Sequence, residues 1–163
     1  MEALTCRLSK FSLEVAEDKT RILPMGRFKG TKESFDFLGF TFYNTKNRKG
    51  KYMLGIRTSA KKLKAKMQAA KAWLRTRLTE PVSVTMQKLA AALRGHYNYY
   101  GVNGNYKFLY KFCNYVMLTT YRMLNRRDQK GRLHRHKFLR IWNYYTKPPR
   151  ITKDIWNWHP KTA

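Results

Sequence analysis

Residues 106–125 restrict the possible folds of this 163-residue chain more than any other segment does. At helical spacing, Leu, Val, Met, Phe, Cys and Tyr fall on nearly every side of this segment, and charged residues are few. A helix with this pattern must be surrounded by other elements, because it has no polar face to turn toward water. The sequence therefore predicts a mainly α fold in which 106–125 is the centre of a three-helix bundle.

Two amphipathic segments before this helix predict its partners. The first runs from Ser59 and has one apolar stripe, made of Leu63, Met67, Ala70, Leu74 and Leu78. The second has apolar positions that recur at helical spacing, namely Met86, Leu89, Ala90, Leu93, Tyr97 and Tyr100. Pro81 separates the two helices, Ser83 or Thr85 can cap the second, and Gly101 ends it.

A small β-hairpin is predicted ahead of the bundle. The aromatic run at 35–43 and the apolar run at 52–56 read as two strands, separated by the basic, turn-like segment 44–51. A glycine inside a strand gives up packing, so Gly39 and Gly55 need an explanation. Either a bulge or close approach to the backbone, or a bend over the core, explains them equally well.

The two ends of the chain carry weaker patterns. A helix over 1–15 is predicted from the spacing of Leu4, Leu8, Phe11 and Val15. The tail, 126–163, is basic and aromatic. A short helix from about His134 to Tyr145 is predicted in it, before the break that Pro148-Pro149 must cause.

The balance of charge indicates a polyanionic partner. Thirty-five Lys and Arg against nine Asp and Glu give a formal net charge of +26, and 28 of the basic residues lie in 37–163. A protein this basic needs a polyanion or an anionic membrane nearby, and aromatic rings spread through periodic segments favour nucleic acid. The sequence has neither an apolar run of about 18 residues nor a signal peptide, so we expect a cytoplasmic protein with no membrane partner.

Cysteine and histidine do not predict a metal site. Cys6 and Cys113 lie far apart in the sequence and are expected to be buried, reduced thiols, and two cysteines rule out a cysteine-rich zinc site. His134 and His136 are two positions apart, so they are expected to point to different faces of a helix, with Asp128 as the nearest acidic residue. We therefore expect no bound metal.

The first bundle helix is unusually rich in basic residues: Lys61, Lys62, Lys64, Lys66, Lys71, Arg75 and Arg77. Lysines in a first turn oppose the helix dipole at about 0.3–1 kcal/mol each, and they also repel one another. A solvated face does not need this arrangement, because mixed charges would dissolve it equally well. Contact with phosphates is the favoured interpretation.

The segment LRGHYNYYG at 93–101 places several rings with polar tips at a helix end. Tyr97 and Tyr100 lie on the apolar stripe and are expected to be core residues with their hydroxyls near the surface. The other candidates in the segment are Arg94, His96, Asn98 and Tyr99. These four residues suit either an ordinary surface or contact with single-stranded RNA by stacking and backbone grip.

Five parts of the sequence, taken in order, carry a family resemblance. They are LEVAEDKTRI at 13–22, FDFLGFTF at 35–42, RTSAKK at 57–62, LRGHYNYYGVNGNYKFL at 93–109, and MLNRR at 123–127 with PPRIT at 148–152. Together they resemble the C-terminal part of a bacterial group II intron reverse transcriptase/maturase, over almost the whole chain. The resemblance implies a palm remnant at 1–58, the maturase-specific thumb or X domain at 59–125, and a basic aromatic extension at 126–163.

The resemblance also implies roles for individual residues. The primer-grip hairpin of the family, which supports the primer end, is similar to Phe37, Leu38, Gly39 and Phe40. Lys19 looks like a lysine that lies near the incoming nucleotide's phosphates when a catalytic chain is present. The chain departs from the family at His96, where Trp is frequent, and at Asp18, where Glu is usual.

The polymerase centre of the family is missing from the sequence. That centre needs a Tyr-Ala-Asp-Asp turn and a further aspartate to hold two metal ions, and this chain contains no Asp-Asp pair. The Cys-pair and His-Asn elements of the family's DNA endonuclease domain are missing too. We therefore expect no enzymatic activity from the chain alone and no cofactor, with Mg²⁺ needed only by a full-length family polymerase.

The expected function is to bind group II intron RNA, or other structured RNA, and to assist splicing. The expected RNA-binding residues are Lys46, Arg48, Lys49, Lys51, Arg57, Lys61, Lys62, Lys64, Lys66, Lys71, Arg75, Arg94, His96, Asn98, Tyr99, Arg126 and Arg127. Three alternatives stay open. The first is a piece of a split or truncated reverse transcriptase that acts with an upstream palm chain. The second is a decayed remnant of a mobile element, and the third is a ribosomal or nucleoid-type basic protein.

Overall fold

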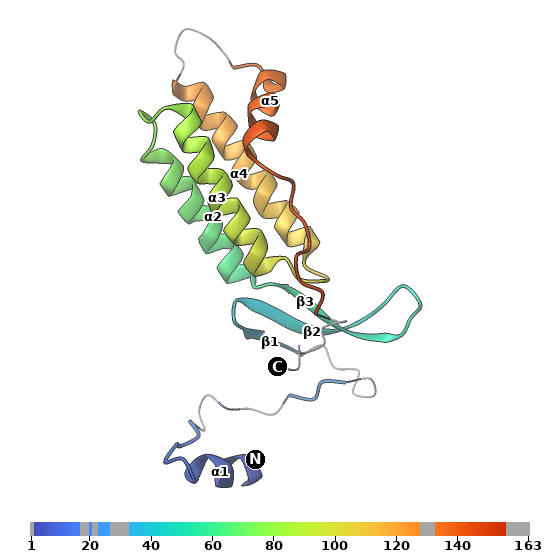
Figure 1. Ribbon diagram of the computed structural model, residues 1–163. Helices are drawn as coiled ribbons and strands as arrows, with labels where there is room; N and C mark the ends of the chain where they lie inside the picture. The colour runs from blue at the N-terminus through green and yellow to red at the C-terminus, as the bar shows by residue number, and fades with distance from the viewer. Residues whose placement is uncertain (1, 17–19, 21–22, 27–32, 128–132, 156–163) are drawn as a thin grey trace, which may run out of the picture.

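A computed structural model describes residues 2–16, 20, 23–26, 33–127 and 133–155 of the chain. Over these residues the fold is mainly helical with one small antiparallel sheet, which confirms the predicted class (Figure 1). The strands are β1 (Ser34–Phe37), β2 (Phe40–Lys46) and β3 (Tyr52–Thr58). The helices are α1 (Glu2–Ser9), α2 (Ala60–Arg75), α3 (Val82–Tyr100), α4 (Tyr106–Arg127) and α5 (Arg135–Tyr145).

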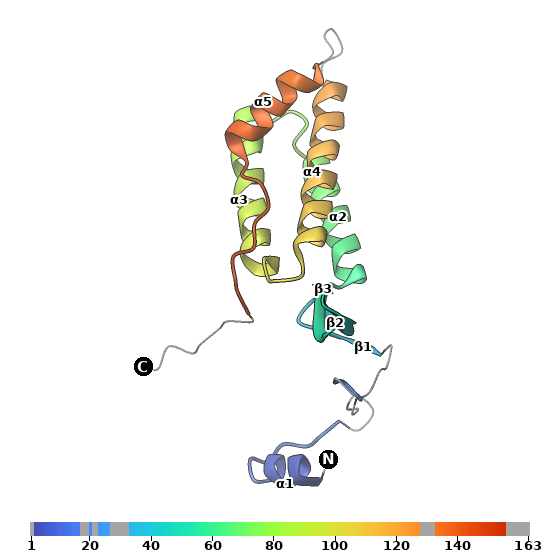
Figure 2. The same ribbon diagram turned by 90° about the vertical axis from the view of Figure 1, so that its right-hand side faces the viewer.

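The sheet and the helical bundle are stacked end to end. Figures 1 and 2 both place the strands at the end of the bundle where α2 begins, α3 ends and α4 begins. α2 and α4 therefore run in the same direction, away from the sheet, and α3 returns toward it. α1 lies apart from the bundle in both views, and none of its residues is buried.

The helix predicted over 1–15 is shorter than expected. α1 ends at Ser9, and the side chain of Phe11 beyond it is 69% exposed. A short helix is marginal in water unless an apolar face packs against other elements. The prediction of a helix to residue 15 is wrong because the described part of the chain gives Phe11 no such surface.

The aromatic pattern predicts one strand over 35–43, and this is wrong because the chain reverses direction at Leu38 and Gly39, within the residues that resemble the primer-grip hairpin. β1 and β2 pair antiparallel on either side of this turn. Leu38 has φ 48° and Gly39 has φ 81°, and positive φ at both positions gives the hairpin turn whose twist matches that of the strands. Glycine adopts this conformation freely, whereas it costs Leu38 roughly 1–2 kcal/mol.

Gly55 has a different explanation from Gly39. It pairs with Tyr43 between β3 and β2, and a Cβ at Gly55 would lie 2.5 Å from the Tyr43 ring. The ring thus occupies the space above the glycine backbone. The close approach that the sequence offers as one explanation is confirmed for Gly55, and the neighbour is a side chain of the same sheet.

α4 is the centre of the bundle, as predicted. It packs against α2, α3 and α5, and its residues Leu109 and Val116 are 0% and 1% exposed. α5, predicted within the tail, adds Phe138 and Trp142 to the same hydrophobic core. The bundle therefore has four helices in the described part of the chain, one more than the three predicted.

α3 begins without a side-chain cap. It starts at Val82 with Pro81 in the cap position, and no side chain there bonds to the first amides of the helix. The Thr85 hydroxyl instead donates to the Glu80 carboxylate at 3.0 Å. The prediction that Ser83 or Thr85 caps this helix is wrong, because both residues already lie inside its first turn.

The segment after α5 returns along α3 to the sheet end of the bundle, and we name residues 146–153 the strap (Figure 2). The amides of Thr152 and Lys153 both donate to the Gly101 carbonyl, at 2.7 and 2.9 Å. A Cβ at Gly101 would lie 2.3 Å from the Tyr97 carbonyl oxygen. Glycine is therefore required where α3 ends and the strap docks.

Asn105 connects the sheet to the bundle, and its side chain is 0% exposed. The side-chain oxygen of Asn105 accepts a hydrogen bond from the Thr58 amide at 2.7 Å. Its side-chain nitrogen donates to the Tyr100 carbonyl at 2.8 Å and to the Thr58 hydroxyl at 2.9 Å. This set of bonds, the Asn105 junction, satisfies buried polar groups at the end of β3 and at the end of α3.

Replacement of Asn105 by Ala is expected to lower the free energy of unfolding by roughly 2–4 kcal/mol, because the buried Thr58 amide loses its partner and the Tyr100 carbonyl keeps only the bond from the Val102 amide. Urea denaturation followed by circular dichroism measures the change. Asn103→Ala is the matched control, since the Asn103 amide bonds to Asp154 at an exposed position and its loss is expected to stay within about 0.5 kcal/mol. Equal losses in the two variants would contradict a special role for the junction.

Candidate nucleic-acid interface

Five basic side chains meet at a groove of about 910 Å³ between α2 and α4. They are Lys71 and Arg75 from α2 and Arg122, Arg126 and Arg127 from α4. The side chains of Tyr115 and Thr119 also line the groove, and its described lining contains no carboxylate. We name this surface the α2–α4 groove.

Sequence reasoning finds four of these basic residues and misses Arg122. The signal is present in the sequence, because Tyr115, Thr119, Arg122 and Arg126 recur at spacings of four, three and four and so share one face of α4. The segment reads as apolar nearly all round when tyrosine is grouped with the apolar residues. In the structure this face is a polar row that borders α2.

The carboxylate of Glu80 does not oppose the charge of the groove. It pairs with Lys88 and lies 3.7 Å from the Arg77 guanidinium. Hydrogen bonds from Lys88 and Thr85 lower the pKa of Glu80. The Glu80 carbonyl also accepts a hydrogen bond from Arg127 at 2.8 Å, which holds the end of α4 against the loop before α3.

A second surface brings three predicted segments together at the sheet end, and we name it the turn site. It is a cavity of about 580 Å³ whose lining includes Leu38, Gly39, Lys62, Lys66 and Tyr99. The Tyr99 hydroxyl donates to the Leu38 carbonyl at 2.8 Å, and the Tyr99 ring stacks on Phe40 at 6.0 Å between centroids. The primer-grip-like residues, the α2 lysines and the 93–101 segment thus share one surface.

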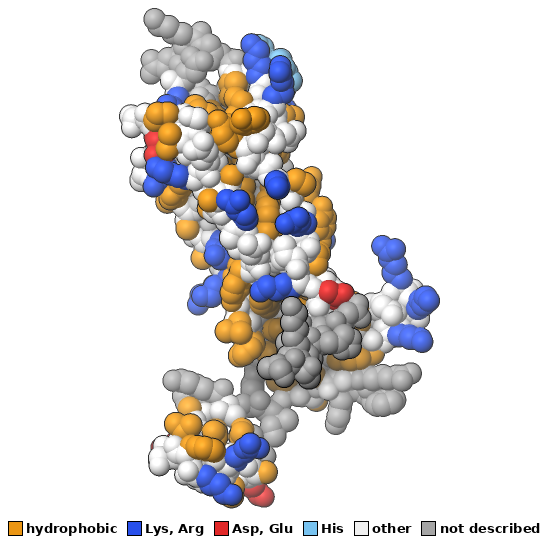
Figure 3. Space-filling view, viewed as in Figure 1, with side chains coloured by type: hydrophobic (Ala, Val, Ile, Leu, Met, Phe, Trp, Pro, Cys, Tyr) orange, Lys and Arg blue, Asp and Glu red, His pale blue; other side chains and the backbone are white. Residues whose placement is uncertain are grey.

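The basic residues of the β2–β3 hairpin lie on a separate surface. Lys46, Arg48, Lys49 and Lys51 are all exposed, and Figure 3 shows basic side chains projecting from this hairpin, away from the bundle. Arg57 lies over the Tyr43 ring, 5.1 Å from its centroid, at the edge of the sheet. The basic residues of this hairpin, which are predicted to contact RNA, are thus not part of the α2–α4 groove.

Other predicted residues are also dispersed. Lys61 and Lys64 are exposed on α2. Arg94 and Asn98 line a cleft of about 340 Å³ together with Lys147 and Arg150 from the strap region. Lys19 lies outside the described residues.

His96 is buried, so its predicted place among the surface residues of the 93–101 segment is wrong. It is 7% exposed, and its ring stacks on Phe112 with the centroids 4.0 Å apart. Leu89, Leu93, His96 and Tyr100 recur at spacings of four, three and four, which places His96 on the apolar stripe of α3. The helical spacing therefore predicts burial of His96, whereas the polarity of histidine favours a surface position.

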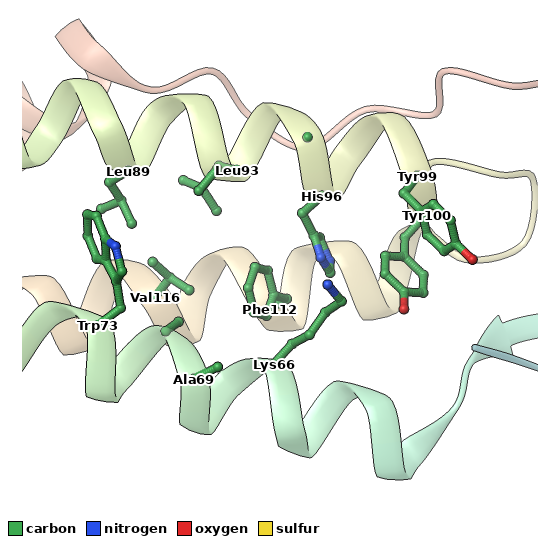
Figure 4. Close-up of a pocket in the computed structure, with 13 residues that line it drawn as sticks. Lys66, Ala69, Trp73, Leu89, Leu93, His96, Tyr99, Tyr100, Phe112 and Val116 are labelled. Atoms are coloured by element: carbon green, nitrogen blue, oxygen red, sulfur yellow. The ribbon is translucent and has the colours of Figure 1, made fainter. Parts of the chain in front are cut away.

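The imidazole of His96 lies in a groove of about 550 Å³ between α2 and α3, which we name the α2–α3 groove (Figure 4). Within the described residues, neither ring nitrogen has a hydrogen-bond partner. Burial, and secondarily the charge of Lys66, lower the pKa of His96 from 6.5 to about 4. The ring is therefore neutral at pH 7, with one donor nitrogen and one acceptor nitrogen.

Tyr97 and Tyr100 are core residues, as predicted, with exposed fractions of 5% and 3%. The expectation that both hydroxyls lie near the surface is wrong for Tyr97, whose hydroxyl is buried beside the Cys113 thiol. Burial raises the pKa of Tyr97. Cys113 is buried and free, as predicted, whereas Cys6 is free but exposed.

No group of three or more His, Cys, Asp or Glu side chains that could hold a metal ion occurs among the described residues. The rings of His134 and His136 stack with centroids 5.8 Å apart, so the prediction that they point to different faces is wrong. The reason is that His134 precedes α5 and has extended backbone geometry.

In the ranges that the structure describes, no helix is both long and apolar enough to cross a membrane. Comparisons with protein-family models, with curated proteins and with solved structures find no match. Evidence for the function therefore comes from the surfaces of the chain itself and from its sequence motifs.

Replacement of His96 by Phe is expected to raise the free energy of unfolding at pH 7 by about 1–2 kcal/mol, because two unpaired buried nitrogens are removed and the ring still stacks on Phe112. In the wild type, the free energy of unfolding should fall as the pH is lowered from 6.5 toward about 4, since the unfolded chain then binds a proton that the folded chain does not. The total loss is at most about 3 kcal/mol.

Urea denaturation of wild type and His96→Phe at neutral and acidic pH measures both effects. His136→Gln is the matched control, because it removes a histidine from an exposed position on α5. If His96→Phe keeps the acid-induced loss of the wild type, the loss does not arise from His96.

Replacement of Leu38 by Asn is expected to raise the free energy of unfolding by roughly 0.5–1 kcal/mol. Asn tolerates the positive φ of this position better than Leu does, and the Leu38 side chain is 67% exposed, so little burial is lost. Thermal denaturation tests the change, with Phe37→Asn as the control just before the turn. A stability below that of the wild type would mean that the Leu38 side chain packs in the folded protein.

Proposed function

We propose that this chain is an RNA-binding module of maturase type, which holds structured group II intron RNA and assists its splicing. The observation that carries the proposal is the α2–α4 groove. Five basic side chains from two helices meet there, and its described lining has no carboxylate. Structural packing alone does not require such a surface, since like charges gathered at a helix interface repel one another.

The groove has the chemistry of a phosphate-binding surface. Arg75, Arg122 and Arg126 carry guanidinium groups, whose planar forks match the oxygens of a phosphate. Helical spacing continues the two basic rows toward the sheet, because Lys64 lies seven residues before Lys71 and Lys111 four residues before Tyr115. Two parallel rows of this kind suit a folded RNA, which proteins recognise largely through its shape and its phosphates.

Among the polyanions that could bind this groove, the sequence motifs favour an intron RNA. Five segments of the sequence resemble a group II intron maturase in order, and proteins of that family bind their own intron RNA. In this proposal the chain acts by binding and not by catalysis, because its sequence lacks the Asp-Asp pair of the family's polymerase centre. The β2–β3 hairpin and the cleft beside the strap would add further phosphate contacts.

A second candidate function is that of a reverse-transcriptase piece that docks on a separate palm chain. The observation that favours it is a set of exposed apolar side chains outside the bundle, namely Leu4, Phe11, Leu13, Phe37 and Leu38. An apolar set of this kind suits a protein partner better than it suits a phosphate backbone. A reading frame just upstream that ends in a Tyr-Ala-Asp-Asp palm, and whose product co-elutes with this chain, would support this candidate.

The double variant Arg75→Gln/Arg122→Gln is expected to weaken binding of a group II intron RNA by roughly 5- to 30-fold, because two exposed charged contacts to phosphate are lost. The slope of log affinity against log salt should fall by about two. Filter binding at about 50 and about 200 mM salt measures both quantities.

Arg7→Gln/Lys10→Gln is the matched control, since it removes the same charge from the region of α1, apart from the bundle. Equal effects of the two double variants would mean that net charge, and not the groove, determines binding. A length-matched unrelated RNA tests the intron part of the proposal. Equal binding of both RNAs, lost together as salt rises, would refute preference for the intron.

A further inference from the structure

The α2–α3 groove is built differently from the basic groove on the other side of α2. Trp73 lies toward one end, Tyr99 and Tyr100 lie at the other, and Phe112 and Val116 of α4 form the floor (Figure 4). The lining is mostly apolar and aromatic, with Lys66 reaching in from α2. The shape and chemistry of this groove suit a flat ring better than they suit a phosphate backbone.

Small residues keep the groove open. Ala69 and Ala70 from α2 and Ala92 and Gly95 from α3 all line it. A Cβ added at Gly95 would meet no atom within 4 Å, so the space beside this residue is empty. The two helices thus leave room where larger apolar side chains would have closed the interface.

The imidazole of His96 is the polar group of this groove that lacks a partner. The residue is 7% exposed, and neither ring nitrogen has a hydrogen-bond partner within the described residues. Buried polar atoms are nearly always hydrogen-bonded, because an unmade bond costs stability. A ligand in the groove would supply the missing partners, and the neutral ring offers it one donor and one acceptor.

We propose that the α2–α3 groove takes one unpaired nucleobase of a bound RNA, with a hydrogen-bonding edge of the base against His96 and an adjacent phosphate held by Lys66. The inference rests on the proposed RNA binding and adds a site that reads a base. Base edges carry donors and acceptors side by side, and unstacked bases pack on aromatic walls such as the Tyr99 and Tyr100 rings, which lie at the His96 end of the groove.

Lys66 controls access to the site. In Figure 4 its ammonium group points toward the His96 ring, and it lies 5.5 Å from the centroid of the Tyr100 ring. The Lys66 side chain is exposed and flexible, so an entering phosphate can draw the ammonium group outward and uncover the imidazole. An apolar helix from a protein partner would fill the space but would leave both His96 nitrogens unpaired, which favours a base as the occupant.

The test compares three RNA hairpins of equal length: one with a single bulged nucleotide, one with an abasic residue at the bulge, and one fully paired. The abasic RNA keeps the phosphates and removes the base. The wild-type chain is expected to bind the base-containing bulge roughly 10-fold or more tightly than the abasic one. The ¹⁵N resonances of the His96 imidazole should shift with the first RNA and stay unchanged with the second.

Two variants examine the groove from opposite sides. His96→Phe removes the hydrogen bonds, and Ala69→Phe fills the groove from an exposed position on α2 while His96 stays in place. Both should reduce the preference for the base to about 1-fold and leave the affinity for the abasic RNA unchanged. Arg75→Gln/Arg122→Gln should do the reverse, with weaker binding to all three RNAs and the same preference for the base.

The outcomes separate this inference from the proposed function. Binding of none of the RNAs overturns RNA binding itself, and the base site with it. Equal binding of the bulged and abasic RNAs overturns the base site alone. If His96→Phe does not fold, Ala69→Phe decides, and an unchanged preference in that variant overturns the inference.

Discussion

The arrangement of the sheet on the bundle depends on one buried amide. A strand that ends against a helical bundle leaves backbone groups with no partner in either element, and such groups must be satisfied if they are buried. The Asn105 side chain serves the Thr58 amide and the Tyr100 carbonyl together. The Asn105 side chain fixes the end of β3 against the end of α3. The turn at Leu38 and Gly39, in the same sheet, is thereby held against Lys62 and Tyr99. The geometry of the turn site therefore follows from a residue that lies outside that site.

The basic residues of the α2–α4 groove repel one another in the free protein. α2 and α4 run parallel and both carry basic residues toward a shared groove, so the free protein keeps like charges close together. Burial of Leu74 and Met123 beneath this groove offsets the repulsion. Two described carboxylates are paired away from this groove: the hydroxyls of Thr41 and of Ser59, just before α2, donate to Asp36 of β1 and lower its pKa, and Lys88 pairs with Glu80. A bound polyanion would supply the charge that the groove itself lacks.

The sequence alone predicts those elements whose position follows from a repeating spacing of apolar residues. The helices at 60–75, 106–127 and 135–145 follow from apolar spacing, and so does the burial of Tyr97 and Tyr100. The apolar pattern did not reveal the turn at Leu38, because leucine rarely adopts positive φ and only Gly39 is a turn residue; the hairpin there was expected from the family resemblance alone. The candidate site was harder to predict than the fold. Its basic residues come from two segments about 50 positions apart, and no periodicity reports which helices lie side by side.

The strap gives the molecule a particular order of assembly. Its contacts with Gly101 join residues 51 positions apart, so closing that loop costs roughly 3–4 kcal/mol of chain entropy before any bond is gained. Helices held by local contacts can form before such a closure, which places the strap among the last parts to fold. By the same reasoning it is among the first to open. The Thr152 amide should then exchange its hydrogen with solvent long before the amides of α4 do, and the cleft beside Arg94 would open and close with it.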